Sequence, residues 1–337
     1  MDISKRQPAS NSEYISVVVP AFNEAASLPG LMSRLDDVFD TIGEPYELLV
    51  VDDGSTDTTW EVLTRSKLTR GKLRAIRLSR NFGKEAAICA GLKAVRGAAV
   101  IVMDADLQHP PELLPKIIDL WRSKGTYVVN AVKETRQSES MIRGAGAHLF
   151  YFLFRKLTGL DLRQTTDFKL LDRRAVEGYL ALPEHGRFFR GLTVWLGYPA
   201  SAIPFIPQER PPEAGDSRWS INKLLKLARH SLISFTALPL QLVTWFGIIT
   251  LLLSIVLGLQ TLWQKWRGEA VEGFTTVILV QLGVGSILMI SLGLIGEYLA
   301  RIYDEIKNRP QYIIAEVLEQ KEQDILFPEV TAQGKSR

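Results

Sequence analysis

Two long stretches near the C-terminal end contain no charged residue, and they constrain the fold more than any other feature. One covers residues 238–262 and the other covers residues 273–296. A helix needs about 20 residues to cross the hydrocarbon core of a bilayer. We therefore predict two transmembrane helices joined by a short loop, with the rest of the chain folding outside the bilayer.

Basic residues around these stretches predict their orientation. An even number of crossings places both ends of the hairpin on one side of the membrane. That side carries six flanking cations, against Lys265 and Arg267 in the loop: Lys223, Lys226, Arg229, Arg301, Lys307 and Arg309. Because positive flanks stay in the cytoplasm, we predict an integral inner-membrane protein with both termini and the preceding domain cytoplasmic.

The part of the chain before these stretches has the pattern of an α/β domain. Short apolar runs rich in β-branched residues alternate with segments of helical periodicity; the runs are 15–19, 47–51, 73–78, 99–103 and 127–132. This alternation predicts a mostly parallel sheet with helices on both faces. Residues 1–14 lack the apolar core of a signal peptide and are predicted to be a flexible tail.

Composition excludes some classes of function. The net charge of +3 is small and dispersed, and no basic run is interleaved with aromatic residues, so a nucleic-acid partner is not expected. Cys89 is the only cysteine, which rules out an intrachain disulfide. Neither a dinucleotide fingerprint nor a P-loop motif is present.

Acidic residues collect where three of the apolar runs end. Glu24 follows the first run, Asp52 and Asp53 follow the second, and Asp104 and Asp106 follow the fourth. Ligands of open α/β sheets bind beyond the carboxyl ends of the strands. Side chains at i and i+2 of an extended segment point the same way, so the last pair suits a divalent cation. The alternative interpretation is a solvated loop, or helix capping at residues 55–56.

Four short motifs in this domain resemble a known family. They are VVVPAFNE at 17–24, VVDDGSTD at 50–57, RNFGKEAA at 80–87 and DADLQHPP at 104–111. In this order they resemble family 2 glycosyltransferases with a GT-A fold. The closer resemblance is to the polyprenyl-phosphate glycosyltransferases, which include dolichol-phosphate mannose synthase and the GtrB-like enzymes. GEYLARIYDEIKNRP at 296–310 resembles the end of GtrB-like proteins, so the resemblance covers about residues 15–315.

The resemblance implies a site for a UDP-sugar. Six residues would border or bind the donor: Pro20, Phe22, Glu24, Asp52, Asp53 and Lys84. Asp104 and Asp106, with Gln108, would hold the metal and the donor diphosphate. Oxygen ligands of this kind suit Mg²⁺ or Mn²⁺ rather than zinc, and His109 is interpreted as a loop residue.

The resemblance also implies a site for a lipid phosphate acceptor. Asp167 would lie between donor sugar and acceptor, either orienting the sugar or assisting proton removal; the alternative is a turn cap. The loop at 209–219 resembles the acceptor loop of the family, with Arg218 in place of the usual Lys. Four residues are candidates for binding the acceptor phosphate: Arg143, Arg210, Ser217 and Arg218.

The predicted organisation follows from these observations. After the tail come a GT-A domain over 15–219, an amphipathic membrane-interface helix over 220–236, the two transmembrane helices and a cytoplasmic segment over 297–337. Packing in a core is the alternative for the interface helix. Glycines in the second apolar stretch could allow close helix contact, and the family resemblance suggests a homo-oligomer such as a tetramer.

The expected function is transfer of a sugar, with glucose favoured by the resemblance, from a UDP-sugar to undecaprenyl phosphate, inverting the anomeric centre. A processive polysaccharide synthase is disfavoured, because Gly215 stands where its Q-x-x-R-W motif has Gln and only one hairpin is present. A non-catalytic, membrane-anchored nucleotide-sugar-binding protein is the other alternative.

Overall fold

A computed structural model describes residues 14–134, 155–156, 158–162, 165–184, 186–207, 238–268 and 273–319. The chain divides into two compact units. The first contains residues 1–155, 160–218 and 310–337, and the second contains residues 156–159 and 219–309.

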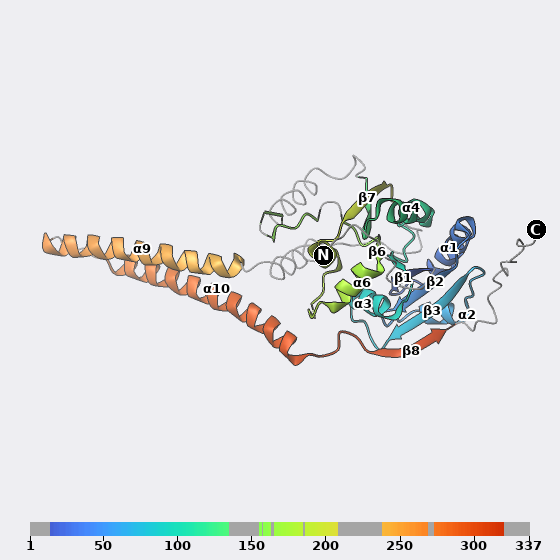
Figure 1. Cartoon of the computed structure of the whole chain (residues 1–337). Coiled ribbons are helices and arrows are strands. Elements are labelled where there is room, and N and C mark those ends of the chain that lie inside the picture. The colour runs from blue at the N-terminus through green and yellow to red at the C-terminus, as the bar shows by residue number, and fades with distance from the viewer. Residues whose placement is uncertain are drawn as a thin grey trace, which may run out of the picture. The chain divides into compact units, whose positions relative to one another are not determined.

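The first unit is built on an eight-stranded sheet with the order β7-β5-β6-β4-β1-β2-β3-β8 (Figure 1). The strands are β1 Ile15–Ala21, β2 Tyr46–Asp52, β3 Gly71–Leu78, β4 Ala99–Val102, β5 Val128–Lys133, β6 Lys169–Asp172, β7 Ala200–Phe205 and β8 Ile314–Glu319. Strands β1 to β4 pair in parallel, as do β5 and β7, whereas β6 and β8 run antiparallel to their neighbours. The predicted α/β class is confirmed, and the five predicted runs correspond to β1 to β5.

Helices cover both faces of this sheet. They are α1 Leu28–Ile42, α2 Thr59–Arg65, α3 Lys84–Ala94, α4 Leu114–Lys124, α6 Arg173–Ala181 and α7 Phe189–Trp195. Alternate residues of a strand point to opposite faces. Val17 and Val19 therefore join the core packed by α1, α2 and α4, whereas a Cβ at Gly91 of α3 would lie 2.4 Å from Val18 Cγ1 on the other face.

Local sequence sets where several helices begin and end. Proline stands in the first turn of α1 and of α4, where its missing N–H costs nothing. Gly43 and Gly125 end these helices in the left-handed conformation, with φ of 74° and 60°. The Asp172 side chain accepts a hydrogen bond from the Arg174 N–H and so caps α6.

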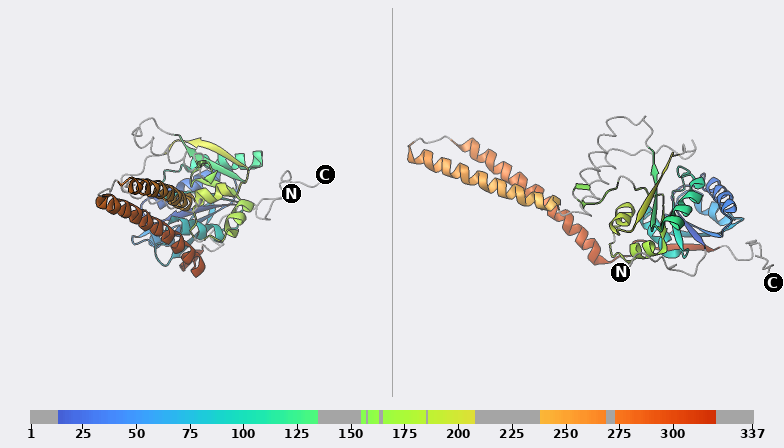
Figure 2. Two further views of the ribbon diagram at one scale, coloured as in Figure 1. Left: turned by 90° about the vertical axis from the view of Figure 1, so that its left-hand side faces the viewer. Right: turned by 45° about the horizontal axis from the view of Figure 1, so that its top comes forward.

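The second unit contains two long helices, α9 Leu238–Trp266 and α10 Phe274–Lys307, which lie side by side (Figures 1 and 2). Large apolar side chains on them are exposed, among them Leu251 at 61% and Val256 at 63%. Within the described residues, Gly283–Lys307 is long and apolar enough to cross a membrane, and Trp245–Gln260 is a shorter apolar helical stretch. Two crossings with the predicted limits remain a prediction.

Candidate active site

The acidic residues predicted from the sequence meet at one edge of the sheet because of its topology. Strand β4 ends at Val102, two residues before Asp104. Strand β6 runs antiparallel to it, and Val102 pairs with Lys169. Asp167 therefore precedes β6 at the same edge at which Asp104 follows β4, although the two residues are far apart in the sequence.

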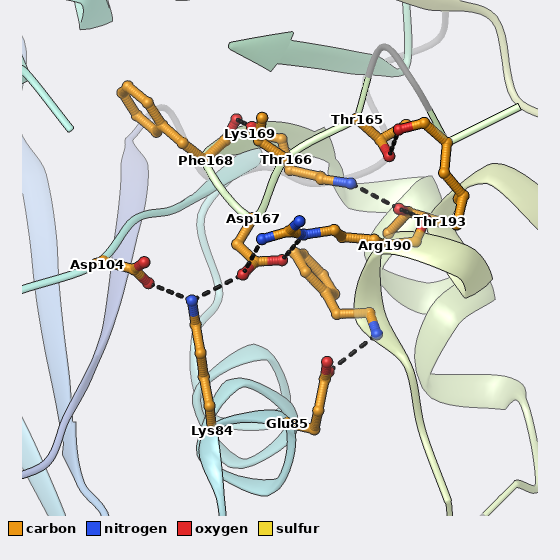
Figure 3. Close-up of polar contacts among 12 residues, drawn as sticks. Lys84, Glu85, Asp104, Thr165, Thr166, Asp167, Phe168, Lys169, Arg190 and Thr193 are labelled. Carbon is orange, nitrogen blue, oxygen red and sulfur yellow. Dashed lines mark hydrogen bonds and ion pairs between the residues drawn. The ribbon is translucent and has the colours of Figure 1, made fainter. Parts of the chain in front are cut away.

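A chain of alternating charges joins these two carboxylates (Figure 3). Lys84, the first residue of α3, places its Nζ 2.6 Å from Asp104 Oδ1 and 2.7 Å from Asp167 Oδ2. Arg190 of α7 donates to the same Asp167 carboxylate, from Nε to Oδ1 at 2.7 Å and from Nη2 to Oδ2 at 2.9 Å. Four segments of the first unit thus contribute to one polar cluster.

The cluster combines a buried member with more accessible ones. The Asp167 side chain is 12% exposed, whereas those of Lys84 and Arg190 are each 40% exposed and that of Asp104 is 27% exposed. A ligand can therefore reach both cations and Asp104, while the less exposed Asp167 carboxylate pairs with both cations.

The pKa shifts follow from this arrangement. Burial by itself raises the pKa of Asp167, but Lys84 and Arg190 outweigh it and hold that pKa well below its usual range. Burial by itself lowers the pKa of Lys84, but Asp104 and Asp167 outweigh it and raise that pKa above its usual value. Asp167 and Lys84 therefore stay ionised at neutral pH.

Two further titratable groups lie next to the cluster. Glu85 Oε2 accepts a hydrogen bond of 2.9 Å from the Phe189 N–H at the start of α7. Burial, with the nearby charge of Asp167, raises the pKa of Glu85 to about 7. Lys169 is fully buried and donates to Thr193 Oγ1 at 2.8 Å; burial lowers its pKa to about 7.

The loop after β4 is ordered by its own polar groups. The Asp104 N–H donates to His109 Nδ1 at 3.0 Å, and the Gln108 N–H donates to Asp106 Oδ1 at 3.1 Å. His109 is buried, stacks on Phe168 with ring centroids 4.8 Å apart, and has its pKa lowered by burial. Its ring nitrogen supports the loop backbone, in agreement with its interpretation as a loop residue.

The donor atoms of this loop fit a hard divalent cation. Asp104, Asp106 and Gln108 offer carboxylate and amide oxygens, the ligand type of Mg²⁺ and Mn²⁺. Across the described residues, no three His, Cys, Asp or Glu side chains gather as a ready-made metal site. Mg²⁺ is commonly held by one or two carboxylates together with substrate phosphates, so this sparse set fits a metal that binds together with a diphosphate.

Asp52 and Asp53 fix the backbone of two neighbouring loops. Asp53 accepts the Phe82 N–H at 2.7 Å and the Gly83 N–H at 2.9 Å, and Asp52 Oδ1 accepts the Ser55 N–H at 2.9 Å. Asp52 is 0% and Asp53 3% exposed, and burial raises the pKa of Asp53. Direct contact of either carboxylate with a nucleotide stays a prediction.

The loop after β2 is closely packed against its neighbours. Gly54 has a φ of +67°, and a Cβ there would lie 2.4 Å from the Arg80 carbonyl carbon, so only glycine allows this approach. On the other side, the Asn23 N–H donates to Ser55 Oγ and Asn23 Oδ1 accepts the Thr56 N–H, both at 2.9 Å. Since Asp53 also accepts the Phe82 and Gly83 N–H groups, this loop fixes the turn that directly precedes Lys84.

The remaining residues predicted to face the donor lie at the end of β1. Pro20 belongs to the buried strand, and Phe22 is 42% exposed beyond it. The Glu24 carboxylate accepts a hydrogen bond from the Ser27 hydroxyl. An exposed aromatic ring at this edge is available to a nucleoside, and this role stays a prediction.

Part of the predicted site lies outside the described residues. The predicted interface helix at 220–236 and the four candidates for binding the acceptor phosphate lie there. The four candidates stay predictions: Arg143, Arg210, Ser217 and Arg218.

Arg190 of the cluster was not predicted from the sequence, and neither were its two neighbours Glu85 and Lys169. The available signal was Arg190 itself, a cation in the otherwise largely apolar segment 188–196. A partly buried cation needs a carboxylate, but the sequence does not say which one.

Comparison with known proteins places this site in a family. Residues 16–180 match the model of Glycosyl transferase family 2, and residues 238–302 match that of the GtrB C-terminal hairpin. An uncharacterized glycosyltransferase from Synechocystis sp. is 37% identical, over 90% of this chain and 95% of its own length. The chain belongs to the GtrB-like family 2 glycosyltransferases.

Other relatives match a similar share of this GtrB-like chain. The uncharacterized glycosyltransferase YkcC of Bacillus subtilis is 38% identical over 89% of this chain and 92% of its own length. A prophage bactoprenol glucosyl transferase homolog of Escherichia coli is 32% identical over 90% of this chain and 99% of its own length. The predicted enzyme class, a glycosyltransferase, is confirmed, and the family match together with the mixed sheet confirms the expected GT-A fold.

Proposed function

We propose that this glycosyltransferase transfers glucose from UDP-glucose to a polyprenyl phosphate, giving polyprenyl-phosphate glucose and UDP. The observation that carries the proposal is the charge cluster of Asp104, Lys84, Asp167 and Arg190 at the carboxyl edge of the sheet. Relatives named as bactoprenol glucosyl transferases, matched over nearly their whole length, support the choice of sugar and acceptor.

The cluster suits a reaction between two phosphate-bearing substrates. Their mutual repulsion has to be overcome to bring them together, and fixed cations do this without reorganisation. Lys84 and Arg190 are cations held in place by Asp167 and accessible from outside. Lys84 would face the donor diphosphate, and Arg190 would face the sugar or the acceptor phosphate.

The bond changes require no protein base. An oxygen of the lipid phosphate attacks the anomeric carbon as the bond from that carbon to the UDP oxygen breaks, which inverts the centre in a single displacement. A phosphate monoester has a second pKa near 6, so the acceptor is largely a dianion at neutral pH. With its pKa far below its usual range, Asp167 is a poor proton acceptor, and its role would be to orient Lys84 and Arg190.

Asp104, Asp106 and Gln108 would hold Mg²⁺ or Mn²⁺ beside the diphosphate. When bound, such an ion supplies positive charge that neutralises UDP as a leaving group. In the absence of substrates, the ion pair with Lys84 compensates the charge of Asp104.

The membrane arrangement completes the proposal. Both long helices would cross the inner membrane, with the catalytic unit and both termini in the cytoplasm, where nucleotide-sugars are made. The amphipathic segment 220–236 would lie at the membrane surface and bring the lipid phosphate to Arg143, Arg210, Ser217 and Arg218. Self-association through the membrane helices, as a tetramer, would follow the family.

A donor panel tests the substrates. Purified full-length protein in detergent is incubated with undecaprenyl phosphate, Mg²⁺ or Mn²⁺, and one radiolabelled nucleotide-sugar at a time. Label from UDP-glucose is expected in the lipid extract, above that from UDP-galactose, UDP-N-acetylglucosamine or GDP-mannose. Preference for another sugar would correct the donor, and binding without transfer from any donor would favour a non-catalytic binding protein.

A further inference from the structure

A row of charged side chains crosses three neighbouring strands at the β8 end of the sheet. Asp52 of β2 pairs with Arg77 of β3, and Arg77 pairs with Glu316 of β8. Side chains of directly paired residues lie on the same face of a sheet and interact. The row therefore alternates negative, positive and negative charge.

Arg77 contacts both carboxylates. Its Nη1 donates to Glu316 Oε1 at 3.2 Å, and its Nε lies 3.5 Å from Asp52 Oδ2. Glu316 Oε2 accepts a hydrogen bond of 3.1 Å from Trp60 Nε1, and the Arg77 guanidinium lies over the Trp60 ring, 5.7 Å from its centroid. Glu316 and Trp60 thus restrict the orientations open to the Arg77 side chain.

Asp52 depends on Arg77 because of its burial. Its side chain is 0% exposed, and Oδ2 has no hydrogen-bond partner among the described residues. A buried carboxylate without a facing cation is strongly destabilised. Since Oδ1 of the same carboxylate accepts the Ser55 N–H, a shift of Asp52 moves the backbone of the 54–57 loop.

We propose that β8 contributes to the donor site, with Arg77 and Glu316 as positioning residues. Glu316 orients Arg77, Arg77 compensates Asp52, and Asp52 fixes the 54–57 loop that borders the donor nucleoside. Strand β8 lies at Ile314–Glu319, beyond both family matches, which end at residues 180 and 302. This inference rests on the proposed donor, UDP-glucose, and on the prediction from the sequence that its nucleoside binds beside Asp52 and Asp53.

Calorimetric titration of full-length protein in detergent with UDP and Mg²⁺ tests the inference. Arg77→Gln is expected to weaken UDP binding about tenfold, because Asp52 loses the cation that pairs with it. Arg77→Lys restores part of this loss. Glu316→Gln is expected to weaken binding about threefold, a smaller effect because the Glu316 side chain is 54% exposed.

Glu319→Gln is the matched control. Glu319 also lies on β8 and pairs with an arginine, Arg74, at 3.0 Å, but Arg74 then contacts Glu47 at 2.6 Å and not the donor loop. This variant is expected to bind UDP as the wild type does. In the transfer assay, Glu316→Gln should raise the KM for UDP-glucose and leave kcat and the KM for the lipid within about twofold.

The outcomes separate this inference from the proposed function. If both Arg77→Gln and Glu316→Gln bind UDP with wild-type affinity, the inference is wrong and the proposed donor still stands. Equal weakening in all three Gln variants, with equal losses in melting temperature, shows general destabilisation and also overturns it. If the wild type binds no UDP, the proposed donor fails as well. Should Arg77→Gln not fold, the pair Glu316→Gln and Glu319→Gln still decides.

Discussion

Arg190 binds the carboxylate of Asp167 through two hydrogen bonds, of 2.7 and 2.9 Å, in the side-on geometry that only a guanidinium provides. Both carboxylate oxygens of Asp167 therefore accept hydrogen bonds from Arg190, and Oδ2 also accepts one from Lys84 Nζ. The carboxylate thus acts as the anchor of two cations.

Removing the charge of this anchor should impair turnover more than folding. Asp167→Asn is expected to lower kcat by about 100-fold, because both cations lose the group that orients them. The measurement is the initial rate of lipid glucosylation at saturating substrates, with melting temperature recorded alongside. Asp40→Asn, whose partner is the exposed Arg70 at 2.8 Å, is the matched control and should retain wild-type rates. A kcat within threefold of wild type for Asp167→Asn would contradict the anchor role.

Arg190 itself gives an independent prediction. Arg190→Lys keeps the positive charge but cannot form two parallel bonds to one carboxylate. We expect kcat/KM to fall about tenfold in Arg190→Lys and about 100-fold in Arg190→Ala. Equal activities of the Lys and Ala variants would contradict this prediction, because they would show that the positive charge alone contributes nothing.

The two aspartates after β4 should be essential for transfer. Asp104→Ala and Asp106→Ala are each expected to abolish lipid glucosylation, since both supply oxygen ligands for the cation beside the diphosphate. Chelation with EDTA should abolish the activity of the wild type, and added Mg²⁺ or Mn²⁺ should restore it. Near-normal turnover in both variants would remove the metal assignment.

Glu85 predicts how stability depends on pH. Its pKa rises from 4.5 to about 7 on folding because of burial, so the folded state holds the proton more tightly than the unfolded state. The stabilisation is full below about pH 4.5 and is lost as the pH rises through 7, by at most about 3 kcal/mol. Glu85→Gln, which keeps an oxygen for the Phe189 N–H, should therefore melt progressively higher than the wild type from pH 4.5 to 7. A difference in melting temperature that does not change with pH would contradict this.

Gly54 tests the close approach of the two loops. Gly54→Ala combines a left-handed residue with a Cβ 2.4 Å from the Arg80 backbone, and we expect a loss of about 2–4 kcal/mol in stability. Gly43→Ala is the control, because Gly43 has a similar φ of +74° but no neighbouring atom within 4 Å; about 1 kcal/mol is expected there. Thermal unfolding compares the two, and equal losses would mean that only backbone conformation matters.

The site residues at the ends of buried strands could be predicted from the sequence. Val100, Ile101 and Val102 are apolar on both faces, and Asp104 follows them, so local pattern and position along the strand sufficed. The same holds for Asp52, the last residue of β2, and for Asp53, which follows it. The apolar runs of β1, β2 and β4 were predicted because each strand is buried along its whole length in the parallel part of the sheet.

The rest depends on contacts that no local pattern encodes. Lys84 and Asp167 are 83 residues apart, and Arg190 joins them from a third segment. Strand β8 was not predicted, since it lies at the sheet edge with most of its side chains exposed and so lacks the continuous apolar run of a buried strand. Its place beside β3 follows from pairing across about 240 residues.

Mass spectrometry of the lipid extract tests the central proposal most directly. Full-length protein is incubated with UDP-glucose, undecaprenyl phosphate and Mg²⁺, beside the Asp104→Ala variant. A lipid species heavier by one hexose, formed in equal amount with UDP and absent with the variant, is the predicted result. Release of UDP with free glucose and no glycolipid, or the same glycolipid from Asp104→Ala, would contradict it.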